Sequence, residues 1–113
     1  MTYEVRWTGA GRALWLEISD ARLKAKFLTL AGGLADHPEQ KGKPLKDDLE
    51  GYLSLHWSRW RIVYSLDEDA SRVWIFVVGQ RMEGKPGDVY RTASKFLRLG
   101  LLTPPPEEDD LPC

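Results

Sequence analysis

The sequence predicts a small α+β domain, and two observations lead to this fold class. The first half of the chain carries a long amphipathic helix pattern, whereas the second half carries three successive strand patterns and then a further helix pattern. Strands that follow one another through short turns pair in antiparallel fashion. We therefore expect a small antiparallel sheet, made of an N-terminal strand and a three-strand meander, with helices on one face and the other face free.

The N-terminal half begins with a strand and continues with helix. Residues 2–7, "TYEVRW", alternate apolar and polar side chains, which is typical of a half-buried strand. Residues 11–18 fit either a strand after a glycine hairpin turn or a short helix. Asp20 is a good N-cap, and apolar residues recur every three or four positions after it, so 21–35 is predicted to be an amphipathic helix. Prolines and a glycine mark the following segment, 36–44, as a loop.

The second half contains the meander and the last helix. Residues 51–57 and 59–66 alternate between two faces, as half-buried strands do. Residues 72–79, "RVWIFVVG", are apolar on both faces, which is typical of a central strand. Asp88 is a suitable N-cap for a helix over about 89–98, where apolar residues again follow helical spacing.

The charges of the chain are segregated, although its formal net charge is only −1. Residues 103–113 form a Pro-rich acidic tail, which we expect to be flexible, so the predicted domain covers 1–102. Four of the 17 acidic residues lie in this tail, which leaves 16 basic against 13 acidic residues in the rest of the chain. The folded part is therefore mildly basic, which permits a phosphate ligand without requiring one.

Several classes of protein are excluded by the sequence. No apolar segment is long enough for a membrane span, and no signal-peptide pattern appears, so we expect no membrane partner. The single cysteine, Cys113, forms no internal disulfide, which favours a cytoplasmic location. His37 and His56 lie far apart, and neither a P-loop nor a dinucleotide fingerprint is present. We therefore expect no metal and no cofactor.

Four polar side chains are predicted to gather at one end of the meander. His56 and Arg61 lie near the turn between its first two strands, Arg81 follows the central strand, and Tyr90 lies in the first turn of the last helix. A helix N-terminus favours anions. Such a set could hold a phosphodiester, with arginine stabilising charge and histidine or tyrosine moving protons.

Each of these residues also has an ordinary structural interpretation. Arg61 fits an exposed strand residue that pairs with a nearby acid, and Tyr90 fits a helix residue that packs on the sheet. His56 fits a surface residue. The lysines between residues 41 and 46 fit a solvated loop. On these patterns alone the alternatives stay open.

The order of these motifs resembles the RelE/ParE superfamily of toxins from type II toxin–antitoxin systems. The resemblance covers the chain to Leu102, and its most specific parts are the strand motif at 60–64, "VGQR" at 78–81 and "DVY" at 88–90. Members of the family begin with a strand and a helical hairpin. The resemblance therefore implies a helix for roughly 11–18 and a RelE/ParE-like fold with a C-terminal helix.

For function, the resemblance to the RelE branch implies a ribosome-dependent endonuclease that cuts mRNA without a metal. In that branch the ribose 2′-hydroxyl attacks the adjacent phosphate while basic side chains stabilise charge and move protons. Family arginines fall on Arg61 and Arg81, and the family tyrosine falls on Tyr90. RelE-type nucleases carry lysines on the first meander strand, where this chain offers only His56 as a titratable group at neutral pH.

The resemblance also implies binding partners and leaves alternative functions open. The expected partners are a cognate antitoxin together with the ribosome and mRNA. Related ParE toxins use the same fold to inhibit DNA gyrase and lack the nuclease residues, and a third alternative is a non-toxic binding member. The candidate catalytic residues are Arg61, Arg81, Tyr90 and His56. The candidate RNA-binding residues are the nearby cations Lys43, Lys46, Arg59, Lys85 and Arg91.

Overall fold

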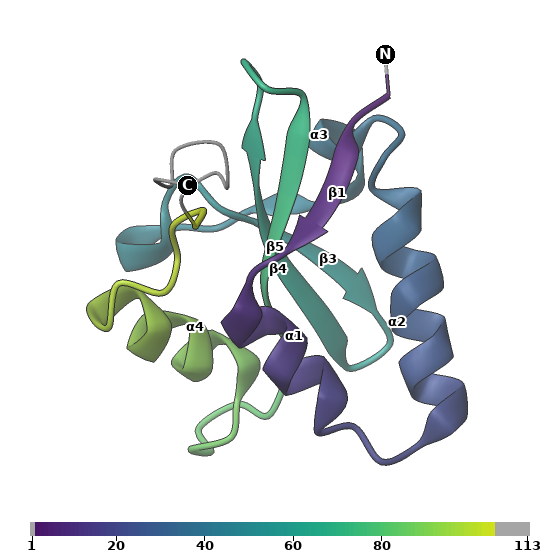
Figure 1. Cartoon of the computed structure of the whole chain (residues 1–113). Helices are drawn as coiled ribbons and strands as arrows, with labels where there is room; N and C mark the ends of the chain where they lie inside the picture. The colour runs from purple at the N-terminus through teal and green to yellow at the C-terminus, as the bar shows by residue number, and fades with distance from the viewer. Residues whose placement is uncertain (1, 106–113) are drawn as a thin grey trace, which may run out of the picture.

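The computed structural model describes residues 2–105 and shows a five-stranded sheet with helices around it (Figure 1). Most of the predicted acidic tail, residues 106–113, lies outside the described residues. In chain order the elements are β1 (Glu4–Trp7), α1 (Gly9–Leu16), α2 (Ala21–Gly33), α3 (Pro38–Lys41), β2 (Lys43–Pro44), the 3-10 helix η1 (Asp47–Leu49), β3 (Leu53–Trp57), β4 (Trp60–Asp67), β5 (Arg72–Gln80) and α4 (Val89–Arg98). No helix within 2–105 is long and apolar enough to cross a membrane.

The predicted α+β fold class is confirmed, with a change at the N-terminal strand. The sheet order is β1-β5-β4-β3-β2, and β3, β4 and β5 form the expected antiparallel meander. The expectation of a purely antiparallel sheet is wrong for β1, which runs parallel to β5 with Val5 opposite Val73. Parallel neighbours need a long crossover, and the helices and the rest of the meander lie between these two strands in the chain.

The short elements between α2 and β3 were not expected. The segment 36–44, predicted as a loop, contains the single-turn helix α3 and the two-residue strand β2. β2 pairs with β3 at the edge of the sheet, where Lys43 lies opposite Ser54. This pairing brings a lysine from a loop-like segment onto the sheet.

Helices cover both faces of the sheet, so the expectation of one free face is wrong. Helix α2 covers the first face (Figure 1). There, Phe27 and Ala31 pack with Ile62, Tyr64 and Ile75. The second face is covered by α4 and is called the α4 face below. There, Val89 and Ala93 pack with a second buried cluster that includes Val63, Trp74, Phe76 and Val77.

Both faces of the sheet are covered because the side chains of β5 are apolar on both faces. Leaving Phe76 and Val77 open to water would forfeit about 1.5–3 kcal/mol for each large side chain. Both residues are fully buried in the structure. The middle of the α4 face is therefore apolar and covered, and the polar groups considered below lie at the end of this face near the start of α4.

The three longer helices begin at side-chain caps. Thr8 accepts a hydrogen bond from Gly11 N, Asp20 from Arg22 N and Leu23 N, and Asp88 from Tyr90 N. Such caps satisfy N–H groups that have no partner inside a helix. The structure makes α1 a helix, as the family resemblance implies.

Candidate functional site

Polar side chains of β2, β3 and β4 share the α4 face at one end of the sheet. His56 lies directly opposite Arg61, and Lys43 lies directly opposite Ser54. Residues directly opposite each other in an antiparallel pair project from the same face. Ser54 is fully buried, whereas His56 and Lys43 are exposed. The pairing therefore places two cations and an imidazole around a buried hydroxyl.

Tyr90 joins this group from the start of α4. Its hydroxyl shares a hydrogen bond of 2.9 Å with the hydroxyl of Ser54 and lies 3.4 Å from Nε2 of His56. Asp88 caps α4 and thereby fixes Tyr90 in its first turn. The structure thus brings His56, Arg61 and Tyr90 together, as the sequence predicted, and adds Ser54 as the group that holds the phenol.

Arg81 reaches the same region, but its charge is already paired. Its Nη1 donates to Oδ1 of Asp88 at 2.6 Å, and its Nη2 donates to Oε1 of Glu83 at 3.2 Å. The guanidinium carbon lies 5.0 Å from the centroid of the Tyr90 ring, a cation–π contact. Arg81 therefore packs against the phenol while its charge pairs with two carboxylates.

Arg61 is anchored to the β3–β4 turn. Its Nη1 donates to the carbonyl oxygens of Ser58 and Trp60, both at 2.9 Å. Its buried Nε has no hydrogen-bond partner among the residues that the structure describes. A buried donor without an acceptor is unfavourable, so this nitrogen is a local cost of holding Arg61 at the turn.

The surroundings of His56 favour its neutral form. Partial burial lowers the pKa of His56, and the charges of Arg61 and Lys43 lower it further. An imidazole with a lowered pKa is unprotonated at neutral pH and can accept a proton. The structure therefore supplies a proton acceptor next to the phenol of Tyr90.

We expect Lys43→Ala to raise the pKa of His56. Removing a nearby positive charge makes it easier to protonate the imidazole. The check is an NMR titration of the His56 ring in both proteins. Lys46→Ala is the matched control, because the causes that lower the pKa of His56 do not include Lys46. An unchanged His56 titration in Lys43→Ala would contradict the predicted influence of Lys43.

The remaining RNA-binding candidates are surface residues. Arg59 is in the β3–β4 turn, and its carbonyl oxygen accepts a hydrogen bond of 2.6 Å from Arg81 N. Lys46 precedes η1, Lys85 lies in the loop before α4, and Arg91 lies in α4. All four side chains are exposed. Their roles in binding stay predictions.

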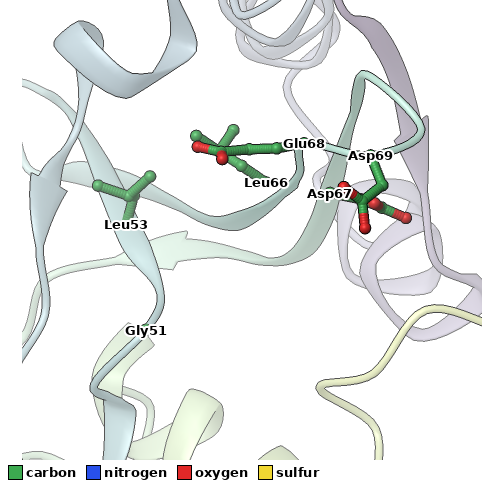
Figure 2. Close-up of a pocket in the computed structure, with 6 residues that line it drawn as sticks. All are labelled: Gly51, Leu53, Leu66, Asp67, Glu68 and Asp69. Atoms are coloured by element: carbon green, nitrogen blue, oxygen red, sulfur yellow. The ribbon is translucent and has the colours of Figure 1, made fainter.

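A separate hollow of about 530 Å³ lies at the other end of β4 (Figure 2). Asp67, Glu68 and Asp69 contribute carboxylates to it, Leu66 lies beside Glu68, and Leu53 lines the hollow from β3 (Figure 2). These acids would repel a phosphodiester, so the hollow is not the candidate site. Within residues 2–105 no group of three or more His, Cys, Asp or Glu side chains is placed to hold a metal ion.

Two residues of the site were missed by the sequence interpretation. Alternation along residues 51–57 puts Ser54 on the same face as His56, but nothing in the sequence indicates its hydrogen bond to Tyr90. Asp88 was recognised only as a helix cap. Its second role, as partner of Arg81, depends on the path of the loop between them, which has no periodic pattern.

Comparison with known proteins defines the class to which this fold and site belong. The structure is similar to a chain of the toxin–antitoxin complex RelBE2 from Mycobacterium tuberculosis, with a TM-score of 0.67 and 30% identity, covering 72% of this chain and 100% of that one. It also shares its fold with a mutant of the E. coli toxin RelE, with a TM-score of 0.65 at 12% identity, covering 88% and 99% of the two chains. The fold is that of RelE/ParE-like toxins.

The chain belongs to the ParE toxin family of type II toxin–antitoxin systems, whose model matches residues 5–84. It is 31% identical to the toxin RelG of Mycobacterium tuberculosis over 91 residues, which cover 80% of this chain and 99% of that toxin. It is 40% identical to the toxin RelE of the same organism over 50 residues, which cover 44% of this chain and about half, 52%, of that toxin. The predicted family is confirmed.

Proposed function

We propose that this toxin is an endoribonuclease that cleaves mRNA on the ribosome without a metal ion. The observation that carries the proposal is the contact of His56 with Tyr90 beside the cations Arg61 and Lys43. RNA cleavage through the ribose 2′-hydroxyl needs a group that accepts one proton and a group that donates another. It also needs positive charge at the phosphate.

In this mechanism, Nε2 of His56 accepts the proton of the 2′-hydroxyl as its oxygen attacks the adjacent phosphorus. The bond from phosphorus to the 5′-oxygen of the next nucleotide breaks, and the hydroxyl of Tyr90 donates a proton to this oxygen. Proton transfer from His56 to Tyr90 across the 3.4 Å contact then restores both groups. Arg61 and Lys43 stabilise the charge on the phosphate, and the products carry a 2′,3′-cyclic phosphate and a 5′-hydroxyl.

A cognate antitoxin protein is a further part of the proposal. The similar RelBE2 chain comes from a toxin–antitoxin complex. The surface of this chain offers apolar area for such a partner, since Leu16, Leu28 and Trp57 are 53%, 50% and 36% exposed. We propose the ribosome and mRNA as the other partners, and the cytoplasm as the location.

The test of the function uses ribosomes that carry a short mRNA with a defined codon in the A site. We expect cleavage within this codon and a 2′,3′-cyclic phosphate on the upstream fragment. The same mRNA with 2′-deoxynucleotides in the A-site codon should stay intact, because the attacking hydroxyl is absent. An intact unmodified mRNA, or equal cleavage of the deoxy form, would exclude the proposed chemistry.

Inhibition of DNA gyrase without nuclease activity is the second candidate function. It is favoured by the family model, which is that of the ParE toxin of parDE systems. Blocked supercoiling by purified gyrase, with mRNA left intact in growth-arrested cells, would support this alternative. Harmless overexpression of the protein would instead support a non-toxic binding member of the family.

A further inference from the structure

One buried carboxylate lies behind the candidate site and takes no part in the proposed chemistry. Asp88 is 2% exposed and accepts hydrogen bonds from three groups. Its Oδ1 accepts from Met82 N and from Nη1 of Arg81, both at 2.6 Å, and its Oδ2 accepts from Tyr90 N at 3.1 Å. Burying a charge is costly unless it is paired and hydrogen-bonded, and here it is both.

The carboxylate joins two parts of the chain that carry site residues. Arg81 and Met82 begin the loop after β5, whereas Tyr90 lies in the first turn of α4. Burial alone would raise the pKa of Asp88, but the hydrogen bonds from Arg81, Met82 N and Tyr90 N outweigh it and hold the pKa below its ordinary value. Asp88 is therefore ionised at neutral pH.

Asp88 also determines what lies against the ring of Tyr90. It holds the Arg81 guanidinium, whose carbon lies 5.0 Å from the ring centroid. The hydroxyl at the far end of the ring is bonded to Ser54 and lies next to His56. The ring is thus fixed by its backbone, by Arg81 and by Ser54.

We propose that Asp88 is a positioning residue, which orients the Tyr90 hydroxyl toward His56 by holding Arg81 against the phenol ring. Arg81 then acts through Tyr90, because its charge is paired with Asp88 and Glu83. The effect on cleavage rests on the proposed nuclease function, whereas the effect on the contact between the two rings does not. Misplacement of a reacting group by about 1 Å can cost about 100-fold in rate.

The first test variant is Asp88→Asn, because an asparagine oxygen in the place of Oδ2 can still cap α4, while Arg81 and Met82 N lose the acceptor that Oδ1 provides. We expect kcat for cleavage of ribosome-bound mRNA to fall about 10- to 100-fold with little change in KM. We also expect the NMR contact between the rings of Tyr90 and His56 to weaken or disappear. Lys43 and Arg61 also face His56, and both stay in place in this variant.

Arg81→Met tests whether Asp88 acts through Arg81, since it keeps the cap and removes the guanidinium. If Asp88 acts through Arg81, the Asp88→Asn/Arg81→Met double variant should cleave about as slowly as the slower single variant. A rate loss in the double variant equal to the product of the two single losses would mean that Asp88 and Arg81 act independently, and it would overturn the proposal.

Asp20→Asn is the matched control, because Asp20 caps α2 with the same kind of hydrogen bonds but lies on another helix. It should change neither kcat nor the ring contact, even if it lowers the melting temperature as much as Asp88→Asn does. An unchanged ring contact in Asp88→Asn would overturn the positioning role. A wild-type protein that cuts no mRNA would instead exclude the nuclease function, and the ring contact would still decide the role of Asp88.

Discussion

Replacing His56 with alanine is expected to slow cleavage of ribosome-bound mRNA by about 10²- to 10⁴-fold, the usual contribution of a positioned acid or base. The imidazole lies 3.4 Å from the Tyr90 hydroxyl, and the same face carries Arg61 directly opposite. Alanine leaves the cations in place but removes the proton acceptor. Binding of the ribosome should therefore be nearly unchanged, and the loss should appear in kcat.

The pH dependence of the wild-type enzyme follows from the lowered pKa of His56. A base must be unprotonated to act, so kcat/KM should fall as the pH drops through this pKa. Because the pKa is lowered, the fall should occur at a lower pH than for an ordinary imidazole. In Lys43→Ala, whose His56 pKa is expected to be higher, the fall should begin at a higher pH.

His37→Ala is the matched control for the His56 variant, because the chain has two histidines. The ring of His37 lies 3.5 Å from both Asp36 and Glu39, just before α3, and has no part in the Tyr90 contact. Its removal should leave the cleavage rate and its pH dependence unchanged. Cleavage by His56→Ala at the wild-type rate would show that another group accepts the proton.

The parts of the fold that could be predicted are those set by periodicity. Alternation in 51–57 and 59–66 places Ser54, His56 and Arg61 on one face, as the strand register confirms. The sequence pattern of β5 also indicates that both faces of the sheet are covered. A strand that is apolar on both sides requires cover on both sides, and in the structure α4 covers the face that was expected to be free.

The direction of β1 and the details of the site could not be predicted in this way. Alternation shows that residues 2–7 form a strand but contains no information on which neighbour it pairs with or in which direction. In the same way, helical spacing places Tyr90 at the start of α4 but not against Arg81. The pairing of β1 with β5 depends on the crossover between these two strands. The contact of Tyr90 with Arg81 depends on the path of the loop that joins Arg81 to Asp88.

Helix α1 approaches the central strand β5 closely. At its start, Thr8 N donates to the carbonyl oxygen of Ile75 at 3.0 Å, and the Thr8 side chain accepts from Gly11 N. Gly11 is buried and lies directly against β5. A Cβ at this position would lie 2.8 Å from the Ile75 carbonyl oxygen and 3.0 Å from that of Phe76. Those atoms belong to the backbone of the most buried strand and cannot rotate away.

We therefore expect Gly11→Ala to destabilise the protein by about 1–3 kcal/mol, the usual cost of overpacking a well-packed core. Such a loss is large against the about 5–15 kcal/mol that holds a typical domain folded. The measurement is urea unfolding followed by circular dichroism. If α1 shifts to make room, the slope of the unfolding transition should stay constant while its midpoint falls.

Gly9→Ala is the matched control, since it makes the same change in the same helix where no atom lies within 4 Å of the new Cβ. Alanine favours helix over glycine by up to about 1 kcal/mol, so this variant should be as stable as the wild type or more stable. If Gly11→Ala lowers the free energy of unfolding and Gly9→Ala does not, the loss comes from contact with β5 and not from helix propensity. If Gly11→Ala also proved stabilising, the close packing of α1 on β5 would not be a source of stability, and the attachment would have to depend on the Thr8 hydrogen bonds instead.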